Sequence, residues 1–278
     1  MEEILEILID TTLDVLKIIP FLFLTYLLLE WLEKQTDKRF EEILKKHNRL
    51  SVLYGALLGL FPSCGFSSAA SSLYATGVIS AGALTAVYLS TSDEMLAIML
   101  SNQAPFSKVY PILLTKLIIA ILAGYILHFM GKKKEIAISD FCERENDDHS
   151  HGILHSAIGH TLQVTLWLFI ITLLLNALIE GIGLENIQSL ITQNPRFSII
   201  LCSLVGMIPS CASSIILSTL YLQDVIPFAA VCAGLLANAG TGAIVLFRVH
   251  PKIKENIQIL LYVLLVSLLS GWILQMIL

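Results

Sequence analysis

Hydrophobic positions along the chain form long runs with few charges, and short polar segments separate these runs. Residues 161–179 and 257–278 carry no charge, and residues 112–130 contain only Lys116 and His128 as basic side chains. A helix needs about 20 apolar residues to cross the hydrocarbon core of a bilayer. The runs therefore predict several membrane-spanning helices, which makes the lipid bilayer the first expected partner.

Composition supports the same class of protein. The chain has 278 residues, of which 56% are hydrophobic and 14% are charged. Soluble domains carry roughly 25% charged residues. We therefore predict an integral, multi-pass membrane protein, and the absence of a basic patch with interleaved aromatic residues argues against a nucleic-acid partner.

The second half of the chain repeats a pattern of the first half. The segment GLFPSCGFSSAASSLYATGVI contains Pro62, and GMIPSCASSIILSTLYLQDVI contains Pro209, 147 residues later. The two segments align without a gap, and the same offset aligns LAGYIL (122–127) with LSGWIL (269–274). An internal repeat with an interrupted apolar segment in each half is typical of secondary transporters.

Basic residues predict the orientation of these halves. Lys and Arg cluster at residues 34–49, 132–144 and 248–254, which we expect on the cytoplasmic side, whereas residues 102–108 and 180–196 are poor in them and are expected outside. Each half then makes an odd number of crossings, so the halves are predicted to be inverted-topology repeats. The predicted units are residues 1–133, a cytoplasmic His-bearing linker at 134–154, and residues 155–278.

Residues 51–102 are too few for three full spans, so we expect a re-entrant hairpin followed by one broken helix. The hairpin tip is predicted at 62–65 and the break at 90–94. The second half is expected to repeat this with a tip at 209–211 and a break at 237–242. The predicted fold is therefore an all-α polytopic membrane protein of about ten helical pieces.

Asp93 and Glu94 lie within an otherwise apolar and hydroxyl-bearing segment. A carboxylate inside a membrane costs about 2.5–3.5 kcal/mol, so it is kept where it faces an ion, a proton path or a cavity. The alternative is that this pair lies at the membrane interface. The matching residues in the second half are Gly240 and Thr241, which makes the predicted site asymmetric. The other predicted ion-binding residues at the two breaks are Ser90, Ser92 and Asn238.

The two predicted tips offer Ser63 and Cys64 in the first half and Ser210 and Cys211 in the second. A thiolate is a soft ligand for thiophilic metals, whereas the oxygen ligands at the breaks suit manganese. A cysteine at a tip is equally well explained as a small residue that permits close helix packing. The remaining apolar-segment cysteines, Cys202 and Cys232, are expected to be buried free thiols.

The predicted linker contains His149, His151 and His155. Short histidine-bearing tracts are candidates for metal binding. The acidic residues around them fit a solvated linker at least as well, and we favour the linker.

The residues GLFPSCGFSSAASSLYATGVISAGALTAVYLSTSDEMLAIML, the histidine-bearing loop and the second Pro-Ser-Cys resemble a bacterial and archaeal family of ten-helix heavy-metal exporters. Its members are labelled manganese transporter or arsenic efflux protein. The resemblance covers nearly the whole chain. It implies export of a metal or metalloid.

The expected function is therefore a secondary transporter that exports a metal cation or metalloid, such as manganese, across the cytoplasmic membrane of a prokaryote in exchange for protons. No resident cofactor is expected, and a homodimer is left open. The first alternative is an organic anion carrier, whose substrate would be attracted by half-helix N-termini. The second is an intramembrane enzyme or scaffold, but an enzyme would need a base near Cys64 or Cys211, and no histidine lies in the predicted core.

Overall fold

The computed structural model describes residues 50–60, 64–91, 95–130 and 197–277, together with shorter stretches between residues 11 and 27 and between 158 and 174. Within these ranges the chain forms helices joined by turns, without a strand. The predicted all-α class is confirmed. The three helices long and apolar enough to cross a membrane in the described part are Phe106–Met130, Phe228–Val249 (with a break inside it) and Ile253–Ile277.

Between residues 50 and 130 the chain forms five helices with defined bounds. They are α3 (Leu50–Gly59), α4 (Cys64–Ala75), α5 (Ala81–Ser90), α6 (Met95–Ser101) and α7 (Phe106–Met130). The Ser80 hydroxyl caps α5 by accepting a hydrogen bond from the Ala83 N–H at 3.2 Å. Helices α3 and α4 flank the predicted hairpin tip, and α5 and α6 flank the predicted break.

Five further helices lie between residues 197 and 277. They are α11 (Ser198–Gly206), α12 (Cys211–Leu222), α13 (Phe228–Ala237), α14 (Thr241–Val249) and α15 (Ile253–Ile277). The second predicted tip falls between α11 and α12, and the second predicted break falls between α13 and α14. Pro251 ends α14, because a residue before proline is disfavoured in helical conformation and His250 is extended.

The two series of helices make matching contacts. Gly124 on α7 and Gly271 on α15 lie 147 residues apart, and a methyl group added at either position would meet neighbours that also lie 147 residues apart. The neighbours of Gly124 are Val52, Gly82 and Ala86, and those of Gly271 are Ile199, Ala229 and Ala233. The sequence repeat therefore corresponds to a repeat of helix packing in three dimensions.

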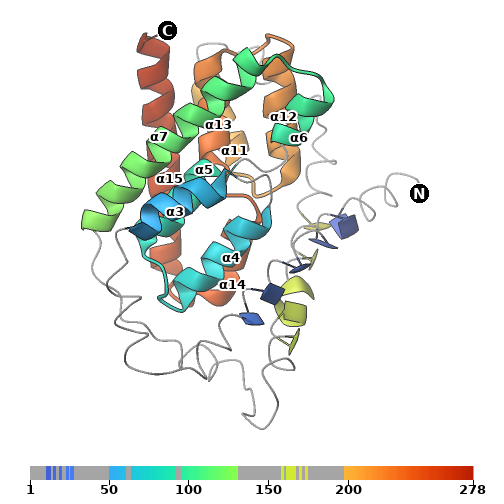
Figure 1. The fold of residues 1–278 in the computed structure, drawn as a ribbon, viewed down its shortest axis with the longest axis vertical. Helices are drawn as coiled ribbons and strands as arrows, with labels where there is room; N and C mark the ends of the chain where they lie inside the picture. Colours follow the sequence, from blue (N-terminus) through green and yellow to red (C-terminus); the bar gives the residue numbers. More distant parts are fainter. Residues whose placement is uncertain are drawn as a thin grey trace.

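Helices from the two halves also interlock. Helix α4, which follows the first tip, packs against α14, which follows the second break. Helix α12, which follows the second tip, contacts α6, which follows the first break. Helices α5 and α13 lie in contact between these pairs (Figure 1), and nearly all of their residues are buried.

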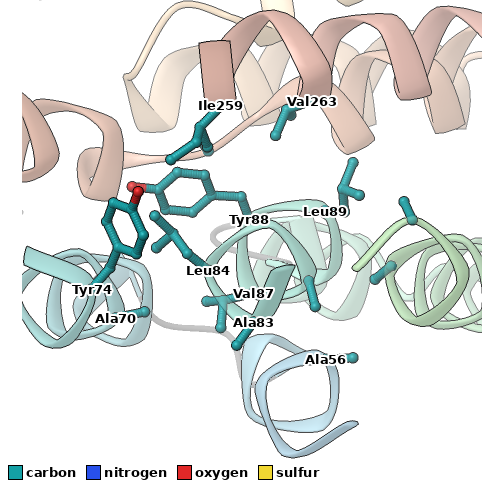
Figure 2. Packing of buried hydrophobic residues seen from close by; sticks show 14 of the residues in the cluster. Ala56, Ala70, Tyr74, Ala83, Leu84, Val87, Tyr88, Leu89, Ile259 and Val263 are labelled. Carbon is teal, nitrogen blue, oxygen red and sulfur yellow. The ribbon is translucent and has the colours of Figure 1, made fainter. Parts of the chain in front are cut away.

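Around α5, the interior is built from small aliphatic side chains and two tyrosines. Leu84 and Val87 of α5 pack among Ala56 of α3 and Ile259 of α15 (Figure 2). Small residues on the facing helices let the backbones approach closely. Tyr88 is fully buried and extends toward α4, where its hydroxyl finds polar partners.

Helices α7 and α15 each carry an exposed apolar stripe. On α7 it consists of Tyr110, Leu114, Ile118, Leu122 and Ile126, and on α15 of Ile257, Leu261, Leu265, Leu269 and Ile273. The four-residue spacing places each set on one helix face. The two sets match at the 147-residue offset, and such continuous apolar surface is what a lipid-facing helix presents.

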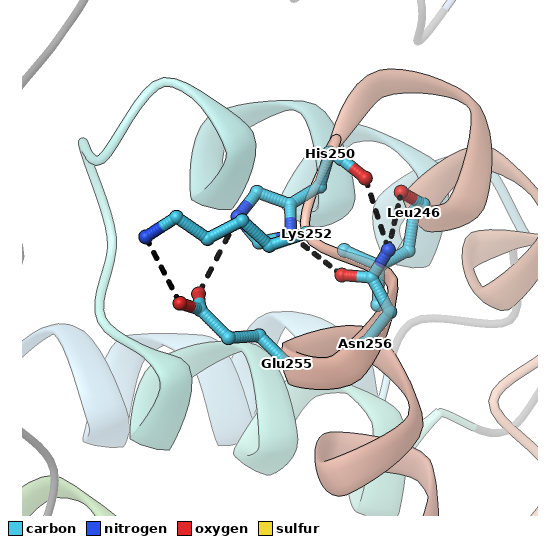
Figure 3. A network of polar contacts seen from close by, with 5 residues as sticks. All are labelled: Leu246, His250, Lys252, Glu255 and Asn256. Atoms are coloured by element: carbon cyan, nitrogen blue, oxygen red, sulfur yellow. Dashed lines mark hydrogen bonds and ion pairs between the residues drawn. The ribbon is translucent and has the colours of Figure 1, made fainter.

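The ion pairs in the described part lie near helix ends. Lys108 at the start of α7 forms an ion pair with Asp224 after α12, with 2.6 Å between Nζ and Oδ1. After α14, the side chain of His250 is hydrogen-bonded to Asn256 and lies 3.6 Å from a Glu255 oxygen (Figure 3). The ring of Tyr74 on α4 covers His250 at 5.1 Å between ring centroids.

His250 was not anticipated as a buried residue. Its side chain is 2% exposed, although its basic neighbours Arg248 and Lys252 suggest a solvated loop. Asn256 explains the burial, because its amide donates to the carbonyl of His250 at 3.0 Å and its oxygen is bonded to the ring. A buried polar group is stable when it is paired.

Candidate functional site

The first helix break follows Ser90. The Thr91 N–H and hydroxyl both donate to the carbonyl of Val87, at 2.9 and 2.6 Å, and so close the last turn of α5. Helix α6 begins again at Met95. The hydroxyl of Ser90 donates to the carbonyl of Ala86 at 2.8 Å, a bond to its own preceding turn that is common for serine in membrane helices.

The second break is closed by Asn238. Its side-chain oxygen accepts a hydrogen bond from the Gly240 N–H at 2.8 Å, and its amide donates to the hydroxyl of Ser214 on α12. Gly240 has φ 58° and ψ −157°, a conformation that only glycine adopts readily. Asn238 is buried. Its side chain therefore stabilises the turn in the interior of the protein and links α12 to the second break.

Hydroxyl groups join the start of α14 to α4. The hydroxyls of Ser68 and Thr241 lie 2.9 Å apart. Those of Ser71 and Tyr88 lie 2.7 and 3.0 Å from the carbonyl oxygen of Gly242. The predicted site residue Thr241 is therefore hydrogen-bonded to a serine of the opposite half, and the second break lies beside α4.

Lys116 is the charged residue that the structure adds to these breaks. It lies on α7, is 1% exposed, and its ammonium group donates to the carbonyl of Thr91 and, at 3.0 Å, to that of Leu235. The two carbonyls belong to the ends of α5 and α13. The signal was present in the sequence, because a lone lysine in a membrane-spanning run is expected to be functional.

The predicted residues are distributed as follows. Ser90, Ser210, Asn238 and Thr241 are buried at the breaks and at the second tip, and the Ser210 carbonyl accepts a hydrogen bond from Ser213 at 2.7 Å. Cys64 and Cys211 begin α4 and α12, although their side chains are not described. The predicted site residues outside the described residues are Ser63, Ser92, Asp93, Glu94, His149, His151 and His155.

The cysteines whose side chains the structure describes are buried free thiols. Cys202 and Cys232 are both fully buried and unpaired, as expected for small apolar side chains. No group of three His, Cys, Asp or Glu side chains that could hold a metal ion occurs among the residues that the structure describes.

A family model described as "Putative, 10TM heavy-metal exporter" matches residues 1–185 and 152–278, which together span the whole chain. The chain belongs to this family. The match confirms the resemblance found in the sequence and agrees with the apolar stripes and helix breaks. The family is one of membrane transporters rather than enzymes.

Searches of curated proteins and of solved structures found no match.

Proposed function

We propose that this protein is a secondary transporter that exports a metal cation or metalloid across the cytoplasmic membrane of a prokaryote in exchange for protons. The observation that carries this proposal is that Lys116 links the buried C-terminal ends of α5 and α13, one from each half, through the carbonyl groups of Thr91 and Leu235. Broken helices that meet inside a membrane protein are the usual means of building an ion site near the bilayer midplane.

Asp93 and Glu94 belong to the chain between α5 and α6, and we assign them the charge of the site. Carboxylate, hydroxyl and amide oxygens at the breaks suit a hard divalent cation such as manganese. Thr241 and Asn238 would supply oxygen ligands from the second half. Cys64 and Cys211 at the starts of α4 and α12 would extend the range to thiophilic metals or a metalloid.

We further propose that the halves, residues 1–133 and 155–278, are inverted repeats that rock against each other. Support comes from the matched neighbours of Gly124 and Gly271 and from α7 and α15, which run in opposite directions (Figure 1). Helix α4 contacts α14 and helix α12 contacts α6, so these pairs form part of the surface between the halves. Movement of one half against the other would open the breaks to each side in turn.

The test in cells is a metal panel. A strain lacking this transporter should become sensitive to at least one of manganese, zinc, iron, nickel or arsenite and should accumulate that element. Plasmid-borne wild type should restore tolerance, and Asp93→Asn should not. Asp224→Asn is the matched control, since it removes an exposed carboxylate that lies between α12 and α13, outside both breaks. Equal tolerance of the deletion strain and its parent to every element would refute export.

An organic anion carrier is the second candidate, because Lys116 places a buried positive charge at the breaks. Two carbonyl groups already bind its ammonium group, and Asp93 and Glu94 would repel an anion. Transport that requires sodium and no metal would favour this candidate over metal export.

A further inference from the structure

Lys116 lies on the buried stripe of α7, one helical turn from Ile112 and one from Ala120, and is itself 1% exposed. Its ammonium group is hydrogen-bonded to backbone carbonyls from both halves of the protein. Thr91 contributes one from the first break, and Leu235 contributes the other from the last turn of α13. One side chain thus links the C-terminal ends of two broken helices.

This position favours a cation for two reasons. The last four carbonyl groups of a helix have no partner within that helix, and Leu235 is among them in α13. The C-terminal end of a helix also carries partial negative charge, which a nearby cation offsets. In transporters with broken helices, such carbonyl groups and helix ends commonly bind a coupling sodium ion or proton.

The second half shows that the lysine is not needed to build the bundle. The residue that matches Lys116 at the 147-residue offset is Val263 on α15, which is fully buried. The residue that matches Thr91 is Asn238, which closes its own break through its side chain. An apolar residue therefore packs at this position in one half, while the other half retains a charge.

We propose that Lys116 is a built-in cation that takes the place of a coupling sodium or potassium ion between the ends of α5 and α13. The inference rests on the proposed transport function. Transport by this protein is then independent of sodium and potassium, and removal of the ammonium group leaves a vacancy that a small external cation can fill. Lys116 is a positioning residue, since it holds the breaks rather than the substrate.

The first test uses the wild-type protein. Purified full-length protein in liposomes is assayed for equilibrium exchange of radiolabelled Mn²⁺, Zn²⁺ or Co²⁺ at equal pH on both sides. Replacing all sodium and potassium by choline is expected to leave the exchange rate unchanged. If exchange falls tenfold or more in choline, the inference about Lys116 is overturned, but the proposed function as a metal transporter still stands. Absence of exchange with all three metals overturns the proposed transport of a metal cation, and the inference with it.

The second test removes the ammonium group. Lys116→Ala is expected to lower exchange by about 10- to 100-fold, the effect of losing hydrogen bonds to a charged group. Methylammonium at equal concentration on both sides should restore part of it. Lys116→Met should be equally slow and should not respond, because its side chain fills the vacancy. Lys108→Ala, the control on the same helix, should show no methylammonium response.

A folded Lys116→Ala protein that exchanges metal at the wild-type rate would overturn the inference. So would a folded, slow Lys116→Ala protein on which methylammonium has no effect, because that result indicates a purely structural lysine. Where Lys116→Ala does not fold, the choline experiment decides on its own.

Discussion

At Gly242 the two halves of the chain approach each other so closely that no side chain fits. A methyl group added there would lie 2.6 Å from the carbonyl oxygen of Ser67 and 2.8 Å from its Cβ. The same glycine carbonyl lies within hydrogen-bond distance of the hydroxyls of Ser71 and Tyr88. Contact between α4 and α14 therefore depends on the absence of a side chain at one residue.

Gly242→Ala is expected to separate α14 from α4, because the neighbour is backbone and cannot rotate away. The cost should be about 1–3 kcal/mol, as for other overpacked positions. Thermal unfolding of the purified protein in detergent measures it. Gly159→Ala is the control, since a methyl group there meets nothing within 4 Å. Equal stability of the two variants would contradict the close approach.

Asn238→Ala should destabilise the second break. The substitution removes the acceptor of the Gly240 N–H and the donor to Ser214, and both lie in the interior. A buried group left unpaired costs about 1–3 kcal/mol. Thermal unfolding should show this loss, whereas Asn102→Ala should be close to neutral, because that amide is exposed. An Asn238→Ala protein as stable as Asn102→Ala would show that the amide is not needed.

At the scale of elements, the sequence predicted the helix ends better than the helix partners. Pro62 and Pro209 indicated the two tips, and the Ser-Thr-Ser and Asn-Ala-Gly segments indicated the two breaks. Proline, glycine and short hydroxyl side chains act on the backbone within a few residues, so the sequence alone shows their effect. The partner of α4 could not be predicted, since an apolar helix with serines on it fits several neighbours. The contacts of Lys116 were missed for the same reason: they depend on carbonyl groups far away in the sequence.

Gly124→Ala and Gly271→Ala test whether the repeat holds at this scale. Each added methyl group would meet the matching set of three neighbours, at 2.7 to 2.9 Å for the nearest two. The two variants should therefore lose similar stability, about 1–3 kcal/mol each by overpacking. Thermal unfolding of each single variant provides the comparison. A large loss of stability in one variant and none in the other would show that the two glycine contacts do not contribute equally to stability.

For the whole molecule, the inverted-repeat proposal makes a prediction about sidedness. Residues 102–108 are expected outside and residues 248–254 inside. In a Cys142→Ser parent, Asn102→Cys should react with a membrane-impermeant maleimide in intact cells. Lys252→Cys should react only after the cells are opened, because the reagent cannot cross the bilayer. Labelling of both from the outside would rule out the proposed topology.

The central claim is that metal crosses the membrane at the meeting of the two helix breaks, with Asp93 and Glu94 supplying the charge. The most direct measurement is metal uptake into liposomes that contain only the purified protein and have an acidic interior. Wild type and Asp224→Asn should accumulate at least one metal as protons leave. Asp93→Asn/Glu94→Gln should be slower by about tenfold or more. Uptake by the double variant at the wild-type rate would contradict the account.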